Sequence, residues 1–216
     1  MNKLWWFWLP AGFLGFQAVI ETVLSPAVLS RLHTENGPHE LIEFALIAAA
    51  CAVAFLTLFR VGKKKNKWMT AWLGLAAFCC FYVAGEEISW GQHFMAWSTP
   101  ELWSAVNDQQ ETNLHNTTSW LDQKPRLLLE LGVLTGGLIL PLLMKYRPAL
   151  VPARFAAIYP PPYFAFVALL ALGVKLADII ADLAGIRLFE RGSEVEELYL
   201  YYFVLLYLLD LRRRIQ

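Results

Sequence analysis

Six long apolar runs decide what this chain can fold into. A helix needs about 20 mostly apolar residues to cross a bilayer. Six segments approach that length, namely Leu4–Leu24, Leu41–Val61, Trp68–Ile88, Leu127–Met144, Tyr163–Leu183 and Val195–Leu211. Hydrophobic residues make up 57% of the chain, against roughly 45–50% in ordinary soluble domains. The sequence therefore predicts an all-α integral membrane bundle of about six transmembrane helices, with residues 1–216 forming a single transmembrane domain.

The basic residues predict the orientation of this bundle. Lys and Arg accumulate on the cytoplasmic side of membrane proteins. With a cytoplasmic N-terminus, twelve of the eighteen basic residues fall on the inner side, namely Lys3, Arg60, Lys63, Lys64, Lys65, Lys67, Lys145, Arg147, Arg154, Arg212, Arg213 and Arg214. We therefore expect both termini inside. The first run is longer than the core of a signal peptide, so we expect it to remain as a helix.

Net charge and cysteines exclude some classes of function. The formal net charge is zero, so no global field favours nucleic acid as a partner. Cys51, Cys79 and Cys80 all lie inside apolar runs, without the spacing of a disulfide framework or a CxxC metal site. We expect them to be small buried apolar side chains.

The acidic residues gather on the side opposite to the basic ones. Every Asp and Glu except Asp210 falls in an outer loop or in the outer half of a predicted helix, and so do all four histidines. Charged residues inside membrane helices mark functional sites by default. The pattern predicts an outer pocket, facing the periplasm, where polar side chains of all six helices meet. An acidic surface that merely contacts water is the alternative.

The motif Gly85-Glu86-Glu87-Ile88-Ser89-Trp90-Gly91-Gln92-His93 closes the third run and carries the strongest candidates for catalysis. If the helix continues through it, Glu86, Ser89 and His93 share one face, whereas Glu87 points about 100° away. We expect Glu86 or Glu87 to act as a general base, and Gln92 of the same motif belongs to the candidate site.

Candidate metal ligands lie at the start of the second run and in the loop after the third. His39 and Glu43, in an HExxE string, are four residues apart and share a helix face. Helix capping explains the glutamates equally well. Glu111 and His115 are also four apart, and His93 completes the set. Imidazole and carboxylate together suit zinc or a similar divalent ion.

The loop between the third and fourth runs has two parts. Thr99-Pro100-Glu101 is typical of a helix start, and Leu102, Trp103 and Val106 would form an apolar face lying on the bilayer. Residues 107–116 are rich in Asn, Gln, Glu and His. We expect this amide-rich segment to fold over the outer pocket as a lid.

The fifth run carries Lys175, Asp178 and Asp182 on one stripe. An ion pair between Lys175 and Asp178 is the simplest way to offset the burial of that charge. The three side chains could instead belong to a path for protons or cations. In the sixth run the continuous apolar part is only Leu198–Leu209, so this is the shortest predicted span.

The string GEEISWGQ, followed by TPELW and by NxxQExNLHN, resembles a signature of uncharacterised bacterial multi-pass membrane proteins. The resemblance implies a multi-pass protein of the bacterial inner membrane. Glu86-Glu87 also resembles the paired glutamates of the CAAX-type intramembrane proteases, but Gly91 stands where their EExxxR motif has Arg. The histidines and acids on one side are similar to the zinc site of the alkaline-ceramidase superfamily, whose seven helices and motifs are absent here.

Three functions remain open on this sequence. The first is a metal-dependent hydrolase or transferase whose partners are membrane lipids or a lipid-linked substrate. In the second, a proton- or cation-coupled transporter would use Glu86, Glu87, Lys175, Asp178 and Asp182. The third is a non-catalytic accessory subunit of a membrane complex, docked through the amide-rich lid.

Overall fold

The computed structural model describes residues 1–32, 37–61, 67–107, 111–114, 117 and 119–215. Within these ranges the chain is all-helical and has no β-strand. Four helical segments are long and apolar enough to cross a membrane, which indicates a membrane protein. They are Pro38–Val61, Lys67–Glu87, Lys124–Tyr146 and Pro162–Leu183.

Helices stand at the positions of all six predicted runs. The second and third runs form α3 (Pro38–Val61) and α4 (Lys67–Glu87), and the sixth forms α10 (Gly192–Ile215). The first, fourth and fifth runs are each assembled from consecutive pieces: η1 (Leu4–Trp8) with α1 (Leu9–Val23), α7 (Ser119–Val133) with η4 (Leu134–Ile139) and α8 (Leu140–Tyr146), and η7 (Pro162–Phe164) with α9 (Ala165–Leu183). The first and sixth are not among the four segments that meet the length and apolarity required of a span.

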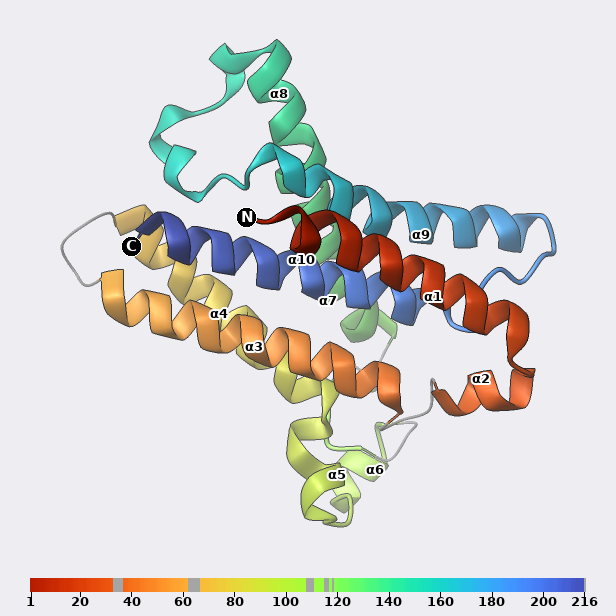
Figure 1. The fold of residues 1–216 in the computed structure, drawn as a ribbon. Coiled ribbons are helices and arrows are strands. Elements are labelled where there is room, and N and C mark those ends of the chain that lie inside the picture. Colours follow the sequence, from red (N-terminus) through yellow and green to blue (C-terminus); the bar gives the residue numbers. More distant parts are fainter. Residues whose placement is uncertain (33–36, 62–66, 108–110, 115–116, 118, 216) are drawn as a thin grey trace.

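Short elements connect these helices. They are α2 (Pro26–Leu32), η2 (Ser89–Gly91), α5 (Gln92–Met95), α6 (Glu101–Ser104), η5 (Pro148–Leu150) and η6 (Ala153–Ile158). The predicted helix on the bilayer surface is therefore a single turn, α6, on which Leu102 is exposed. The short helices α5 and α6 project from the side of the bundle (Figure 1).

The last helix, α10, is the centre of the bundle. It packs against α3, α9 and α7, and α4 packs against α3 and bonds to α10 through Trp72 and Glu87. Tyr199, Leu200 and Leu206 on α10 are almost fully buried. A helix that is surrounded by protein can carry polar side chains if they find partners. This explains why α10 can be extensively buried although its run has the shortest apolar stretch. Its buried residues include two acidic ones, Glu196 and Asp210.

Tyrosine hydroxyls of α10 connect it to its neighbours. Tyr199 donates to the carbonyl of Pro10 at 2.9 Å, and Tyr202 donates to the carbonyl of Trp5 at 2.6 Å. These two contacts make α1 and α10 antiparallel, and the two ends of the chain lie toward the same end of the bundle (Figure 1). At that end Tyr163 donates to Asp210 at 2.8 Å.

The helix of the third run does not continue through the GEEISWGQH motif. Ser89, Trp90 and Gly91 all have positive φ, of 46°, 56° and 94°. An α-helix of L-residues is right-handed and requires negative φ. Three successive residues with positive φ therefore end the helix and turn the chain. The expectation that Glu86, Ser89 and His93 share one face of a continuous helix is therefore wrong. The turn instead brings Trp90 back against Gly85.

Candidate functional site

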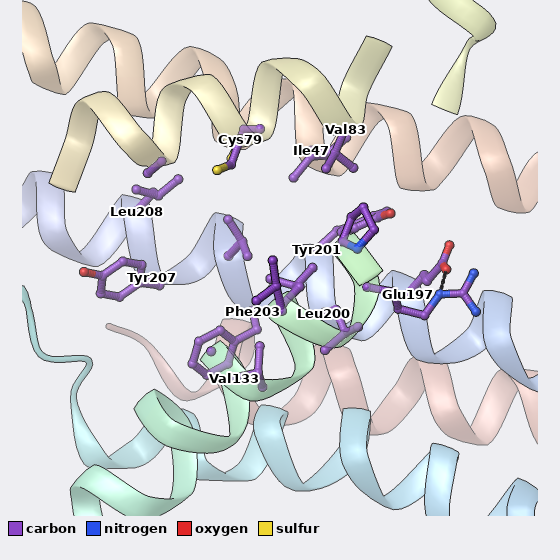
Figure 2. A pocket seen from close by; sticks show the side chains of 18 of the residues that line it. Ile47, Cys79, Val83, Val133, Glu197, Leu200, Tyr201, Phe203, Tyr207 and Leu208 are labelled. Carbon is purple, nitrogen blue, oxygen red and sulfur yellow. Dashed lines mark ion pairs between the residues drawn. The ribbon is translucent and has the colours of Figure 1, made fainter. Parts of the chain in front are cut away.

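A cavity of about 760 Å³ lies between α4 and α7, with α10 as its floor (Figure 2). Its volume is within the roughly 300–1,000 Å³ of small-molecule sites. Most of the wall is apolar, contributed by side chains such as Val83, Val133, Leu200, Phe203 and Leu208. The charged side chains that line it are Glu40 near the start of α3, Glu87 at the end of α4, Glu111 in the connection before α7, Arg126 in α7, and Arg191, Glu194 and Glu197 at the start of α10 or just before it. The cavity therefore has an apolar body and one strongly polar end.

Three glutamates form the core of that polar end. Glu43 of α3 and Glu194 and Glu197 of α10 each place a carboxylate oxygen within 4.8 Å of the others. The two on α10 are three residues apart and share a helix face. Among the described residues this is the only group of three or more His, Cys, Asp or Glu side chains so close together. We call it the carboxylate group.

Glu43 is the unusual member of the carboxylate group. Its side chain is 0% exposed, and neither carboxylate oxygen has a hydrogen-bond partner within the described part of the chain. It also lies near the charges of Glu197, Glu87 and Glu194. A buried carboxylate without a partner is costly, so buried charges are normally paired or coordinate a metal. The position of Glu43 thus calls for a cation or a proton.

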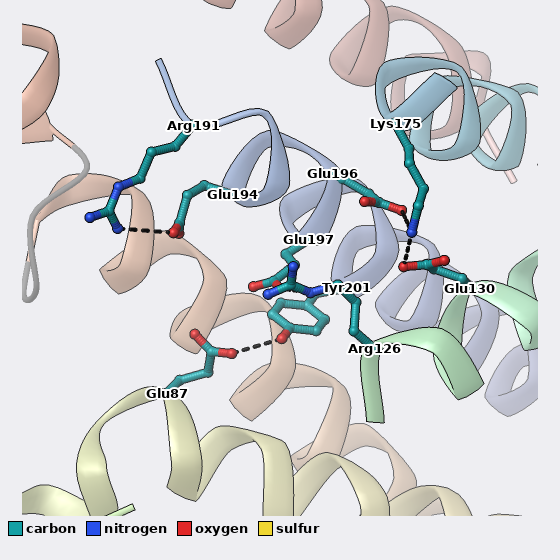
Figure 3. Close-up of polar contacts among 9 residues, drawn as sticks. All are labelled: Glu87, Arg126, Glu130, Lys175, Arg191, Glu194, Glu196, Glu197 and Tyr201. Atoms are coloured by element: carbon teal, nitrogen blue, oxygen red, sulfur yellow. Dashed lines mark hydrogen bonds and ion pairs between the residues drawn. The ribbon is translucent and has the colours of Figure 1, made fainter. Parts of the chain in front are cut away.

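Two arginines and a tyrosine lie beside the α10 members of the carboxylate group, Glu194 and Glu197 (Figure 3). Arg126 of α7 forms an ion pair with Glu197, and Arg191, just before α10, pairs with Glu194 at 3.3 Å. Tyr201 donates its hydroxyl to Glu87, the last residue of α4, at 2.7 Å. All of these residues except Glu43 line the cavity.

Carboxylates outnumber basic side chains among the described residues at this end. The acidic side chains are Glu40, Glu43, Glu87, Glu111, Glu194 and Glu197, and the basic ones are Arg126 and Arg191, so the charges favour a bound cation. Carboxylate oxygens are hard ligands that suit Mg²⁺, Mn²⁺ and Ca²⁺, whereas zinc sites usually include His or Cys. The donor set of the carboxylate group contains neither.

Glu86 faces a different environment from Glu87. It is 4% exposed and accepts hydrogen bonds from Nε1 of Trp90 at 2.8 Å and from the backbone N–H of Leu114 at 2.7 Å. It therefore connects the end of α4 to the amide-rich segment. The two glutamates do point to different partners, as the 100° separation predicts.

The rest of the GEEISWGQH motif also bonds to the amide-rich segment. Ser89 donates to Glu111 at 2.7 Å, and Asn113 donates to Ser89 at 2.9 Å. Gln92 accepts from the backbone N–H of Thr112 at 2.7 Å and donates to Thr99 at 2.8 Å. The polar residues of the GEEISWGQH motif thus form hydrogen bonds that hold it against the amide-rich segment.

Asn107 holds the described part of the amide-rich segment in shape. Its side chain donates to Oδ1 of Asn113 at 2.8 Å and accepts from the backbone N–H of Glu111 at 3.2 Å. Asn107, Glu111 and Asn113 are all buried. Glu111 also lines the cavity. The described part of this segment therefore contributes one side chain, Glu111, to the cavity wall, and we keep the name lid for it.

The three predicted metal ligands whose side chains the structure describes, His39, Glu43 and Glu111, have separate partners. Glu43 belongs to the carboxylate group, but Nε2 of His39 lies 3.2 Å from Oε1 of Gln17 on α1. Glu111 bonds to Ser89 and Asn113 within the lid. His115 and the side chain of His93 are outside the described residues.

Lys175 does not pair with Asp178 as expected. Its ammonium contacts Glu130 of α7, and it lies 3.7 Å from Glu196 of α10 (Figure 3). Asp178 instead lies against Gly192, the first residue of α10, where a Cβ atom would overlap its carboxylate. Asp182 is exposed at the end of α9. The prediction failed because the stripe on α9 faces two other helices, whose carboxylates reach Lys175 more easily.

The described acidic side chains of the candidate site therefore divide into separate networks. The predicted site residues did not include Glu194, Glu197 or Arg126, although the short apolar part of the sixth run allowed Glu194 and Glu197 to lie either at the membrane surface or in the pocket. The spacing of Glu194 and Glu197, three residues apart at the start of a helix, is the signal that could have identified them. No family model matches the chain, and no match is found among curated proteins or solved structures.

Proposed function

We propose that this chain is a six-pass membrane enzyme, a hydrolase or transferase that binds a divalent cation on Glu43, Glu194 and Glu197 and acts on a lipid or lipid-linked substrate. The observation that carries the proposal is the fully buried carboxylate of Glu43, which has no hydrogen-bond partner in the described chain and lies within 4.8 Å of two further carboxylates. An apolar cavity next to such a group supports a substrate with a long apolar part.

The cation and the surrounding residues would have distinct roles. A bound divalent cation polarises a carbonyl or phosphoryl oxygen and lowers the pKa of a bound water. Glu87 lines the cavity and is held by Tyr201, so it is our candidate general base. The oxygen-only donor set favours Mg²⁺ or Mn²⁺ over zinc. Glu86 serves instead to hold the lid.

The proposed topology has both termini in the cytoplasm and the carboxylate group at the outer side of a bacterial inner membrane. The bias of Lys and Arg toward the opposite side supports this orientation. Helices at the positions of all six apolar runs support six crossings. Fusions of an outer-side reporter after residues 32 and 187 should be active, and fusions after residue 147 should be inactive.

Metal binding by the purified chain tests the proposal. Protein in mild detergent is stripped with EDTA and titrated with Mn²⁺, and binding is followed by electron paramagnetic resonance. We expect saturable binding that weakens at least about ten-fold in Glu43→Gln, since even ligand-orienting residues have effects of that size. Glu101→Gln, at an exposed position of α6, is the matched control. Unchanged affinity in Glu43→Gln would refute the site.

A transporter remains the second candidate because of one observation. Lys175, Glu130 and Glu196 form a charged network between α7, α9 and α10, and both carboxylates are buried. Networks of this kind carry protons in membrane transporters. Proton flux into proteoliposomes that disappears in Glu196→Gln would favour transport, and flux equal to that of empty liposomes would exclude it.

A further inference from the structure

The chain after α4 turns back along the helix that it leaves. We call residues 88–107, which include α5 and α6, the side excursion. The ring centroid of Trp90 lies 5.8 Å from that of Phe81, and a Cβ atom at Gly85 would lie 2.8 Å from the same indole. Phe81 is six residues before the end of α4, which is about 9 Å inside that candidate span. The side excursion therefore begins by packing against a spanning helix.

Phe94 on α5 places the side excursion against a second span. Its ring centroid lies 6.4 Å from that of Phe44 on α3, within the range of packed aromatic pairs. Phe44 is the seventh residue of α3, so this contact is also about 9 Å inside the end of a candidate span. A helix of 24 residues is about 36 Å long, and the hydrocarbon core is roughly 30 Å thick. The contact therefore lies within the depth of the core.

The side chains of the side excursion are sorted in the opposite way from those of a loop in water. Its polar side chains Ser89, Gln92 and Asn107 are buried and hydrogen-bonded. Its apolar side chains are exposed, with Met95 at 76% and Leu102 at 85%, and the others are Phe94, Trp97 and Val106. Exposed apolar patches mark contacts with a protein or a membrane.

Charge and backbone bonding indicate which of the two covers this patch. In residues 88–107 the sequence holds no Lys or Arg, and Glu101 is the only acid. Hydrocarbon accepts a turn of this kind only if backbone groups bond within the protein. The N–H of Gly91 bonds to the carbonyl of Ile88, and the N–H of Ala96 bonds to that of Gln92, both at 2.8 Å. A projection from the side of a bundle of spanning helices (Figure 1) has lipid around it. These observations favour the bilayer.

We infer that the side excursion is embedded in the leaflet that holds the end of α4, with Phe94, Met95 and Leu102 in contact with lipid chains and Glu101 at the headgroups. In the proposed topology this is the outer leaflet. The inference goes beyond the expected helix on the bilayer surface, because the contact with Phe44 lies deeper than the headgroups. It does not depend on the proposed metal site. Because Ser89 and Gln92 bond to the lid, the bilayer also supports the segment to which the lid is attached.

Spin labels test the depth of the side excursion. The full chain, with Cys51, Cys79 and Cys80 replaced by Ala, is labelled at Met95→Cys or Leu102→Cys and reconstituted in vesicles of phosphatidylethanolamine and phosphatidylglycerol. Collision with oxygen, which concentrates in hydrocarbon, is compared with collision with a water-soluble nickel chelate. Leu169→Cys, on the exposed face of α9, is the hydrocarbon reference, and Arg187→Cys, 71% exposed before α10, is the water reference. We expect the oxygen-to-nickel ratio at both test positions to lie near that of Leu169→Cys.

Two results would overturn the inference. A ratio at Met95→Cys near that of Arg187→Cys would put the side excursion in water. Low collision with both reagents would show that protein, either a partner or a second copy, covers the patch.

A second measurement uses the wild-type chain and so does not depend on how the cysteine-free protein folds. A lipid-soluble diazirine is activated by light in the same vesicles, and labelled peptides are identified by mass spectrometry. The peptide with Phe94 and Met95 should be labelled as strongly as the one with Leu169. Labelling no higher than at Arg187 would contradict the embedding, whatever the result for Mn²⁺ binding.

Discussion

The hydroxyl of Tyr201 donates a hydrogen bond of 2.7 Å to Oε1 of Glu87. This contact joins the last residue of α4 to the central helix of the bundle. Tyr201 is four residues after Glu197, so it stands one turn below the carboxylate group on the same face of α10. The hydrogen bond therefore holds the end of α4 beside the three carboxylates.

Replacing Tyr201 by Phe should destabilise the bundle. The change removes a hydrogen bond to a charged acceptor, a contribution of about 1.5–3 kcal/mol. Tyr202→Phe is the matched control, because Tyr202 donates to a neutral backbone carbonyl, an interaction of only about 0.5–1.5 kcal/mol. The free energy of unfolding in detergent should fall more for Tyr201→Phe. Equal losses in the two variants would contradict the role of Glu87 as a charged acceptor.

Glu43→Gln should have opposite effects on the metal-free and the metal-bound protein. Without a cation, the change removes a fully buried charge that has no hydrogen-bond partner in the described chain, so the protein should gain stability, on the order of 1–3 kcal/mol. With Mn²⁺, wild-type protein should be stabilised and the variant should gain little. Thermal unfolding with EDTA and with Mn²⁺ measures both. A loss of stability in EDTA would show that Glu43 has a structural role instead.

Lys175→Met should be strongly destabilising, because it leaves Glu130 and Glu196 buried without their counter-charge. Breaking a buried pair costs about 3–5 kcal/mol, and the lower end applies here since Lys175 is 36% exposed. Asp178→Asn should change stability by less than about 1 kcal/mol, the usual size for a carboxylate near a helix N-terminus. Chemical unfolding of both variants decides between the observed network and a pair of Lys175 with Asp178.

The apolar runs were enough to predict where the helices lie. Trp68–Ile88 was predicted where the structure has Lys67–Glu87, because helices that face lipid must be apolar and of a fixed length. The same rule is weak for α10, which extends from Gly192 to Ile215 although its continuous apolar stretch is short. Its surroundings are other helices, so partners such as Lys175 and Tyr163 replace the need for apolar side chains.

The candidate site could be predicted only in part. Spacing singled out Glu43, which lies in the carboxylate group, but it grouped that residue with His39, whose ring contacts Gln17 on α1 instead. Residues four apart on a helix face lie close enough to share a neighbour, yet each can also reach a different one. The partners of Glu43 come from α10, far away in the sequence, and a single sequence gives no information on which helices pack together.

Gly85→Ala should disturb the turn after α4. A Cβ atom at Gly85 would lie 2.8 Å from ring carbons of Trp90, so the indole must move and lose its contact with Glu86. Overpacking of this kind costs about 1–3 kcal/mol. Gly74→Ala is the control, because a Cβ atom there meets nothing within 4 Å and alanine favours a helix by roughly 0.5–1 kcal/mol. The midpoint of thermal unfolding should fall for Gly85→Ala and should not fall for Gly74→Ala.

Glu86→Gln tests whether this residue holds the lid or acts as a base. Glu86 accepts hydrogen bonds from Trp90 and from the N–H of Leu114, and a glutamine has only one acceptor oxygen. One buried donor would then face the amide NH₂, so the lid should loosen. Hydrogen exchange at the Leu114 amide should accelerate, while Mn²⁺ affinity at the carboxylate group stays within about three-fold of wild type, as expected for a site without shared partners. Gln92→Glu changes a second contact between the motif and the lid, because Gln92 accepts a hydrogen bond from the backbone N–H of Thr112. Lost turnover with unchanged exchange at Leu114 would instead assign the base to Glu86 and remove Glu87 from that role.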